Sequence, residues 1–136
     1  MRYLLDSNVW IKVLQARDLR IVDRFTATEP EDMAACSMVR AELMHGAAKY
    51  EDPDLRRSNV ELLLARFVSL PFDDRCADVY ARIRHDLEKR GCVIGPFDLQ
   101  IAAVALVHDL TLVIGNLDEF KRVHGLEVED WSLPMV

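Results

Sequence analysis

Acidic side chains stand at four places in this sequence where packing into a protein core does not require them. One acid follows a short apolar run near the N-terminus, a second lies beside the apolar stripe of a helical pattern, and a third precedes a strongly apolar helical pattern. A fourth, polar segment at residues 114–120 follows another apolar run. The candidate residues are Asp6, Glu42, Asp98 and, in the fourth segment, Asn116, Asp118 and Glu119.

Carboxylates that converge in one site suit the binding of a divalent cation. Neighbouring negative charges raise one another's pKa, so several carboxylates cannot all stay ionised without a cation between them. Mg²⁺ or Mn²⁺ with oxygen ligands removes that conflict, and Mg²⁺ keeps water molecules for a phosphate substrate. Such an ion lowers the pKa of a bound water and neutralises charge on a phosphate, which is the chemistry of phosphodiester hydrolysis. The residues leave open whether one ion or two would bind.

Each acid also has a plainer interpretation. Asp6 and Asp98 both stand where a helix begins, and aspartate is a preferred N-cap. Asp98 would in addition be stabilised there by the helix dipole. Glu42 could be a boundary residue that reaches solvent, and residues 114–120 could be a polar loop before a short helix. The four signals are therefore stronger together than separately.

The elements that must position these acids alternate between strands and helices. That alternation predicts an α/β fold, a three-layer α/β/α sandwich with a mostly parallel sheet, in one domain covering residues 1–136. The carboxyl ends of parallel strands meet at one edge of such a sheet, which is where ligands bind. The predicted strands are 2–5, 33–36, 68–72, 110–114 and one near 126–128. The predicted helices are 8–15, 19–25, 37–50, one starting at 52–53, one from 73 or 74 to 90, one of 99–108 opened by Asp98, and one near 117–122.

Helix-end signals support these boundaries. Asp18 and Ser37 are plausible N-caps, and Asp52 with Pro53 suits a helix start. Gly91 stands where a helix ends.

Composition limits the class of protein. The 136 residues carry 17 Lys+Arg and 23 Asp+Glu, for a net charge of −6, and 51% of them are hydrophobic. This is typical of one soluble globular domain, and the acidic balance taken alone argues against a nucleic-acid binder.

We expect a cytoplasmic protein without a membrane span or signal peptide. The three cysteines have no metal-ligand spacing and are expected to be reduced thiols; they are Cys36, Cys76 and Cys92.

Other acidic-pocket proteins fit the residues less well. A phosphoacceptor receiver domain needs a second acid beside the first and a lysine after a late strand, and this sequence has Ser7 after Asp6 and no lysine directly after residues 110–114. A haloacid-dehalogenase-like phosphatase needs an Asp two positions after the first, where this sequence has Asn8. A binding module that has lost activity remains an alternative.

The constellation as a whole resembles the PIN-domain ribonucleases, and most closely the VapC-type toxins of bacterial toxin–antitoxin pairs. The resemblance covers nearly the whole chain in order. Its most specific pieces are IGPFDLQIAA at 94–103 and the final EDW of GLEVEDW at 125–131; LLDSN at 4–8, AELMHG at 41–46 and GNLDEF at 115–120 also match. The resemblance implies that Asp6, Glu42 and Asp98 are the metal-binding acids, and that hydrolysis leaves a 5′-phosphate and a 3′-hydroxyl.

The fourth segment departs from the family pattern. Ile114 stands where toxins of this class carry a threonine, and Gly115 replaces the first asparagine, whereas Asn116, Glu119 and Phe120 are kept. We therefore expect Glu119 to complete the catalytic acids and Asn116 to assist in cofactor binding, with Asp118 as the alternative. These changes could also weaken the activity.

The resemblance further implies an RNA substrate, a homodimer, and a cognate antitoxin that forms a hetero-oligomer with the toxin and covers its acidic pocket. Exposed apolar faces around residues 9–14 and 60–67 could serve these contacts or simply face the core. Candidate RNA-binding residues are Arg40, Arg82 and Arg84, with Lys89 and Arg90 nearby; Arg56 and Arg57 are placed farther from the acids. Asp86 and Glu88 interleave the 82–90 group, which also fits a solvated helix face.

Overall fold

A five-stranded sheet forms the centre of the computed structural model, which describes residues 1–115 and 117–134, without the side chains of 117 and 118. The strands are β1 (Tyr3–Leu5), β2 (Met33–Cys36), β3 (Val68–Leu70), β4 (Thr111–Val113) and β5 (Val128–Glu129). Their order across the sheet is β3-β2-β1-β4-β5, and every pairing between them is parallel. The predicted fold class is confirmed, with β1 at the centre.

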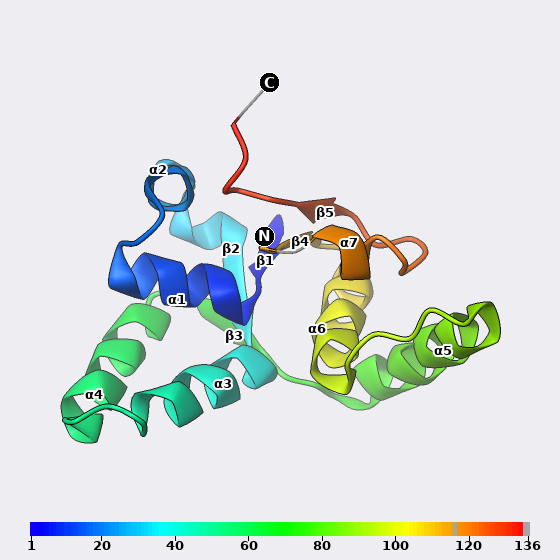
Figure 1. Ribbon diagram of the computed structural model, residues 1–136, viewed down its shortest axis with the longest axis horizontal. Coiled ribbons are helices and arrows are strands. Elements are labelled where there is room, and N and C mark those ends of the chain that lie inside the picture. Colours follow the sequence, from blue (N-terminus) through cyan, green and yellow to red (C-terminus); the bar gives the residue numbers. More distant parts are fainter. Residues whose placement is uncertain (116, 135–136) are drawn as a thin grey trace.

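Helices cover both faces of this sheet, as Figure 1 shows. The chain adds β2 and β3 on one side of β1 and then returns to add β4 and β5 on the other. Because crossovers between parallel strands are right-handed, this reversal moves the later helices to the opposite face. The early helices are α1 (Ser7–Gln15), α2 (Leu19–Ala27), α3 (Ser37–Ala47) and α4 (Pro53–Leu64), and the later ones are α5 (Asp74–Arg90), α6 (Pro96–Val107) and α7 (Leu117–Phe120); a short 3-10 helix, η1 (Pro30–Asp32), precedes β2.

Helix α3 links the two layers. It contacts α1 and α4 of the first layer and also α6 of the second. Helix α6 is apolar all round, and residues 101–105 are fully or almost fully buried in it. An all-round apolar helix belongs in a protein interior; here it lies against α5, β4 and α3. The starts of α1 and α6 are thereby brought to the same region as α3.

Aromatic side chains join α1 to its layer. The Trp10 ring makes edge-on contacts with Phe25 and Phe67, at centroid distances of 5.7 and 5.0 Å. Its indole N–H donates a hydrogen bond of 3.0 Å to the carbonyl oxygen of Leu5. One side chain thus connects the end of β1 with α1, α2 and the segment that follows α4.

Several helix ends follow the predicted signals. The carboxylates of Asp18, Asp52 and Asp73 accept backbone hydrogen bonds at the starts of α2, α4 and α5. Gly91 ends α5 with φ of 69°, a left-handed conformation that glycine adopts without strain. No helix within the described ranges is both long and apolar enough to span a bilayer.

Several predicted boundaries are wrong, among them the end of the helix predicted for 37–50, which stops at Ala47, and of the strand predicted for 68–72, which stops at Leu70. Ser37 is the first residue of α3, whose N-cap is Cys36 without a side-chain hydrogen bond. Helix α6 begins at Pro96 after the N-cap Gly95, so Asp98 lies inside its first turn. Proline at the first helical position needs no hydrogen-bond partner for its nitrogen, which favours the earlier start. The last strand is β5 at 128–129, later than expected.

Candidate active site

The ends of two central strands define the candidate site. Asp6 follows β1 directly, and its backbone N–H donates a 2.9 Å hydrogen bond to the carbonyl oxygen of Val113 at the end of β4. The chain reverses its direction across the sheet between these two strands. A reversal of this kind opens a crevice at the carboxyl edge of an α/β sheet. Asp6 therefore stands where the fold offers room for a ligand.

Asp6 is both a helix cap and a buried acid. One carboxylate oxygen accepts a 3.1 Å hydrogen bond from the backbone N–H of Val9, so the capping interpretation is correct for this residue. Its side chain is nonetheless buried, with 7% of the residue exposed. The pKa of Asp6 is raised to about 7, mainly by burial and also by the charges of Asp98 and Glu42, with the Val9 hydrogen bond acting in the opposite direction. Capping alone does not explain a carboxyl group buried beside two other acids.

Asp98 is free of the capping role, because Gly95 is the N-cap of α6. Its half-buried carboxyl group shares a hydrogen bond with that of Glu119 at the C-terminal end of the α7 region. The pKa of Asp98 is raised to about 6, mainly by burial, together with the hydrogen bond and charge of Glu119 and the charge of Glu42. Two carboxyl groups can share a hydrogen bond only if one of them holds a proton, so the pair is suited to exchanging that proton for a cation.

Glu42 lies on α3, half-buried, at the junction of the acidic site with a neighbouring groove. Its charge raises the pKa of both Asp6 and Asp98, so the three carboxyl groups act on one another. It also lines a groove of about 610 Å³ between α1, α3 and α4. The acids at 6, 42, 98 and 119 are thus brought together by four separate elements.

Two candidates cannot be placed. Asn116 lies outside the described residues, and the side chain of Asp118 does as well. Of the three candidates in the fourth segment, only Glu119 is therefore placed, next to Asp98 through their hydrogen bond.

The donor set fits a hard divalent cation. Burial and other carboxylates dominate the pKa shifts of Asp6 and Asp98, and no lysine or arginine is among the groups that cause them. The hydroxyl of Ser7, beside Asp6, is buried and has no hydrogen-bond partner among the described residues. Within that part of the chain, no three Asp, Glu, His or Cys side chains form a ready-made metal cage. Asp98 and Glu119 bond to each other instead, and a cation would have to separate them.

The predicted RNA-binding arginines are mostly engaged elsewhere. Arg40 forms an ion pair with Glu61 on α4. Arg84 pairs with Glu88 at 3.4 Å and donates to the hydroxyl of Tyr80 at 3.2 Å. Arg82 is exposed on α5. The pairing of Arg84 with Glu88 agrees with the interpretation of residues 82–90 as a solvated helix face.

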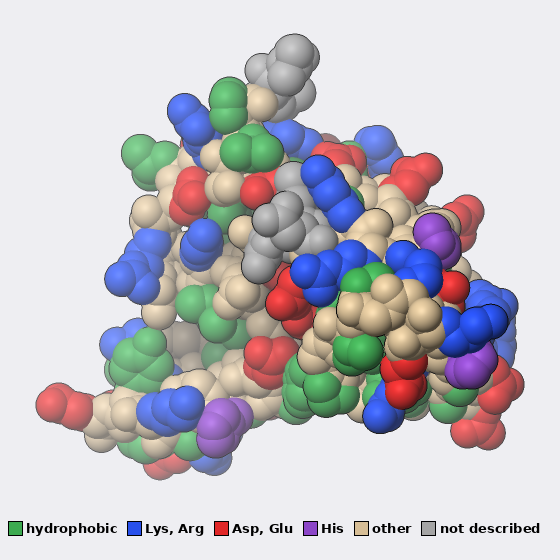
Figure 2. Space-filling view, turned by 45° about the vertical axis from the view of Figure 1, so that its right-hand side comes forward, with side chains coloured by type: hydrophobic (Ala, Val, Ile, Leu, Met, Phe, Trp, Pro, Cys, Tyr) green, Lys and Arg blue, Asp and Glu red, His purple; other side chains and the backbone are tan. Residues whose placement is uncertain are grey.

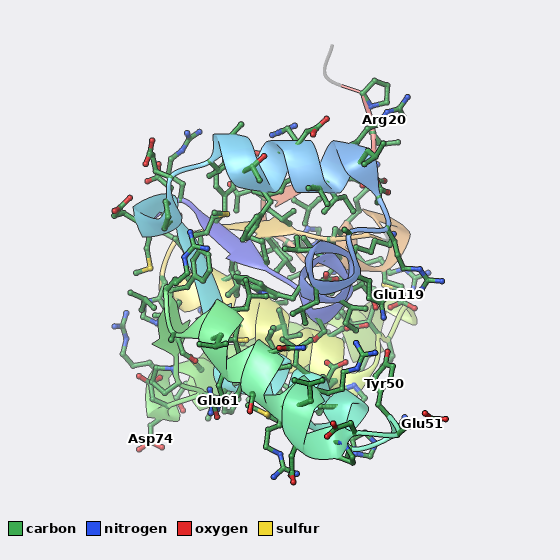
Figure 3. The ribbon with its side chains drawn as sticks, turned by 90° about the vertical axis from the view of Figure 1, so that its left-hand side faces the viewer. Arg20, Tyr50, Glu51, Glu61, Asp74 and Glu119 are labelled. Atoms are coloured by element: carbon green, nitrogen blue, oxygen red, sulfur yellow. The ribbon has the colours of Figure 1, made fainter. Side chains whose placement is uncertain are left out.

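Sequence reasoning missed the groove beside Glu42. Arg56, which we placed far from the acids, lines this groove together with Lys49 and Tyr50. Figure 2 shows acidic side chains next to a hollow that contains hydrophobic side chains. Figure 3 shows Tyr50 and Glu119 toward the same side of the molecule. No local pattern in the sequence indicates the groove, because its walls come from three helices.

Comparison with known proteins relates this arrangement to one family. A family model described as "PIN domain" matches residues 3–126. A curated relative from Haemophilus influenzae, "Ribonuclease VapC2", is 37% identical over 131 residues, which are 96% of this chain and 98% of the relative. A relative from Shigella flexneri, "tRNA(fMet)-specific endonuclease VapC", is 33% identical over 97% of this chain and 99% of its own length.

Solved structures show the same fold. A chain in the crystal structure of DNA-bound VapBC from Salmonella typhimurium is 32% identical, with a TM-score of 0.89 over 96% of this chain and 98% of that one. A chain in the structure of VapBC2 from Rickettsia felis, bound to a DNA fragment from its promoter, is 31% identical, with a TM-score of 0.87 over 96% of this chain and 99% of that one.

Proposed function

This chain belongs to the PIN-domain family, and from that premise we propose that it is a metal-dependent endoribonuclease, the toxin of a type II toxin–antitoxin pair. The observation that carries the proposal is the buried Asp6 with Glu42 and Asp98 as charged neighbours, and with no lysine or arginine of the described residues among the groups that shift its pKa. Its relatives named ribonuclease and endonuclease VapC support RNA as the substrate.

The chain's own residues have separable tasks in this proposal. Asp6 and Asp98 would bind Mg²⁺ or Mn²⁺ directly. Glu42 would contribute either through a second metal site or through a bound water molecule. When bound, the ion supplies an activated water and neutralises charge on the scissile phosphate. Glu119 would hold Asp98 in place through their hydrogen bond. The Val9 N–H fixes the orientation of the Asp6 carboxylate throughout.

We propose a cognate antitoxin as the protein partner, with the chain working in the cytoplasm. The solved relatives are VapBC complexes, which supports a partner of the antitoxin kind. A homodimer, and a hetero-oligomer with the antitoxin, complete the proposed assembly. A polypeptide segment that covers the acidic edge of the sheet would exclude both cation and RNA.

The test is cleavage of RNA by the purified chain with Mg²⁺, with Mn²⁺ and with EDTA. We expect cleavage with either ion and none in EDTA. Asp6→Asn should reduce the rate by at least about 100-fold, because it removes a charge from the ion's site, and its circular dichroism spectrum should match the wild type. Asparagine can still accept the hydrogen bond of Val9, so a loss of rate cannot be attributed to the cap. Equal rates for Asp6→Asn and wild type would refute the assignment.

A further inference from the structure

We propose that the groove between α1, α3 and α4 is a subsite for one unpaired nucleoside of the RNA, next to the phosphate that is cleaved. The identity of this ligand as RNA rests on the proposed ribonuclease function. The location, shape and charge of the groove are independent of it. Of the four acids proposed for the site, only Glu42 lines the groove.

The location of the groove links it to the chemistry. Glu42 lines the groove and also acts on the pKa of Asp6 and Asp98, so the groove starts at the acidic cluster. A nucleotide chain with its phosphate at the acids would therefore place a neighbouring nucleoside in the groove. Its volume of about 610 Å³ lies within the usual range for small-ligand pockets.

The walls suit the faces of a base. Aliphatic side chains line the groove, among them Ile11, Leu43 and Val60. Tyr50 stands at the rim, 43% exposed, and its ring is held in place. The guanidinium of Arg56 lies 4.3 Å from the ring centroid, and the side-chain amide of Gln15 donates a 3.2 Å hydrogen bond to the Tyr50 hydroxyl. Proteins recognise unpaired RNA bases by stacking them on aromatic or guanidinium planes of this kind.

The charge of the groove suits the RNA backbone. Lys49 and Arg56 line it, and neither forms a salt bridge with a carboxylate of the described residues. By contrast, Arg40, Arg57, Arg84 and Arg90 are all paired with acids. The groove therefore presents two cationic side chains beside the acidic site, in a protein of net charge −6. Positions of this kind contact phosphates without reading sequence.

The groove can also distinguish one base edge from another. Asn59 lines it and offers an amide donor and an amide acceptor. The Gln15 amide is already engaged, with Tyr50 and with the guanidinium of Arg17. Asn59 is thus the candidate for contact with a base edge. A purely apolar peptide would use the walls of the groove but would leave the two cations and this amide without a partner, so the observations favour a nucleotide.

Gly46 allows the groove to be blocked without removing any existing contact. It lines the groove from α3, and a Cβ built there meets no atom within 4 Å. Gly46→Leu therefore adds bulk into open space and replaces a poor helix former with a good one. We expect unchanged or higher thermal stability. We also expect the KM for RNA cleavage to rise at least about tenfold, because a base would lose a stacking site.

The charge contribution is tested by a matched pair of substitutions. Arg56→Gln and Arg57→Gln remove the same charge from adjacent residues of α4, but Arg57 lines a different, shallow depression and pairs with Asp54 at 3.9 Å. Binding of a 5′-fluorescein-labelled, seven-nucleotide single-stranded RNA of random sequence is measured by anisotropy on the non-cleaving Asp6→Asn chain. We expect Arg56→Gln to weaken binding about tenfold and Arg57→Gln by less than about twofold.

The outcomes separate the two proposals. If wild type cleaves no RNA, but the Asp6→Asn chain binds the labelled RNA and loses affinity with Gly46→Leu and Arg56→Gln, the subsite stands and the ribonuclease function falls. If the variants leave RNA affinity and KM unchanged, or if the chain does not bind this RNA, the subsite proposal is overturned. Loss of antitoxin binding by Gly46→Leu with unchanged RNA affinity would assign the groove to a peptide and overturn it as well.

Discussion

At the scale of single residues, Asp6 shows how one carboxylate serves both folding and chemistry. One of its oxygens caps α1, and burial beside Glu42 and Asp98 raises its pKa to about 7. The cap explains why the residue is aspartate or asparagine, but only asparagine would be free of the cost of burying a charge. An ionised aspartate at position 6 therefore lowers the stability of the folded protein, and a bound cation would offset that loss.

The pH dependence of stability should reveal that cost. The folded-state pKa of Asp6 lies above the unfolded value of 3.8, so the folded state binds the proton more tightly. The stabilisation of the folded state by this bound proton is complete below pH 3.8 and is lost as pH rises through about 7. In EDTA, we expect the free energy of unfolding of wild type to fall relative to Asp6→Asn by about 2–3 kcal/mol between pH 5 and pH 8. Urea denaturation of both chains measures it.

The same experiment has an internal control. Mg²⁺ or Mn²⁺ should raise the stability of wild type more at pH 8 than at pH 5, because the ion binds the ionised carboxylate. Asp6→Asn should show little of this effect. Asp6→Ala should be less stable than Asp6→Asn by about 1 kcal/mol, since alanine cannot accept the hydrogen bond of Val9. A parallel pH dependence of wild type and Asp6→Asn would show that Asp6 ionises normally.

At the scale of elements, the site depends on how α1 is held at the end of β1. Trp10 fixes this helix through its contacts with Phe25 and Phe67 and through its hydrogen bond to Leu5, the residue just before Asp6. Helix α6 is held differently, by the burial of Leu99 and of residues 101–105 beyond its exposed first turn. The packing of these two helices therefore sets the separation of Asp6 and Asp98.

Replacing Trp10 tests the contribution of that anchor. Trp10→Phe keeps an aromatic ring but removes the indole N–H that bonds to Leu5. We expect a loss of about 1–2 kcal/mol in the free energy of unfolding, from the lost hydrogen bond and the smaller ring. Denaturant unfolding at pH 5 measures it, where Asp6 is largely protonated. An unchanged midpoint would mean that the Leu5 carbonyl does not need this donor.

At the scale of the whole molecule, the net charge of −6 limits how RNA can bind. Arg40, Arg84 and Arg90 of the basic group that the sequence presents are paired with acids, and the groove beside the site is lined by Lys49 and Arg56. Non-specific affinity depends on the number of phosphates that basic residues neutralise. A molecule with two such residues at its site must rely on the cation and on the shape of the RNA.

The salt dependence of RNA binding follows from this count. For the Asp6→Asn chain, a plot of the logarithm of affinity against the logarithm of salt concentration should have a slope between about −1 and −2, since each phosphate contact to a single strand contributes about −0.7. Anisotropy titrations between 0.05 and 0.5 M NaCl measure the slope. A slope steeper than about −4 would indicate an extended basic surface and contradict this description.

Much of the fold could be predicted from local patterns. The buried strands at 3–5 and 33–36, the apolar helix after Pro96 and the turn at Gly91 all follow from hydrophobic runs and from the conformational limits of proline and glycine. The alternation of these elements predicted the parallel sheet. Errors occurred at element ends, where two residue types compete for one cap, as with Gly95 and Asp98.

The sequence by itself determined the order of elements, the fold class and the set of acids, because strand and helix periodicity and the residues after strand ends are local properties. Only the tertiary structure decided that Asp98 is paired with Glu119 and free of capping, that Arg40 is engaged by Glu61, and that Arg56 lines a groove starting at Glu42. These facts depend on contacts between side chains far apart in the chain. Burial and ion pairing arise from such contacts, and no spacing within one segment encodes them.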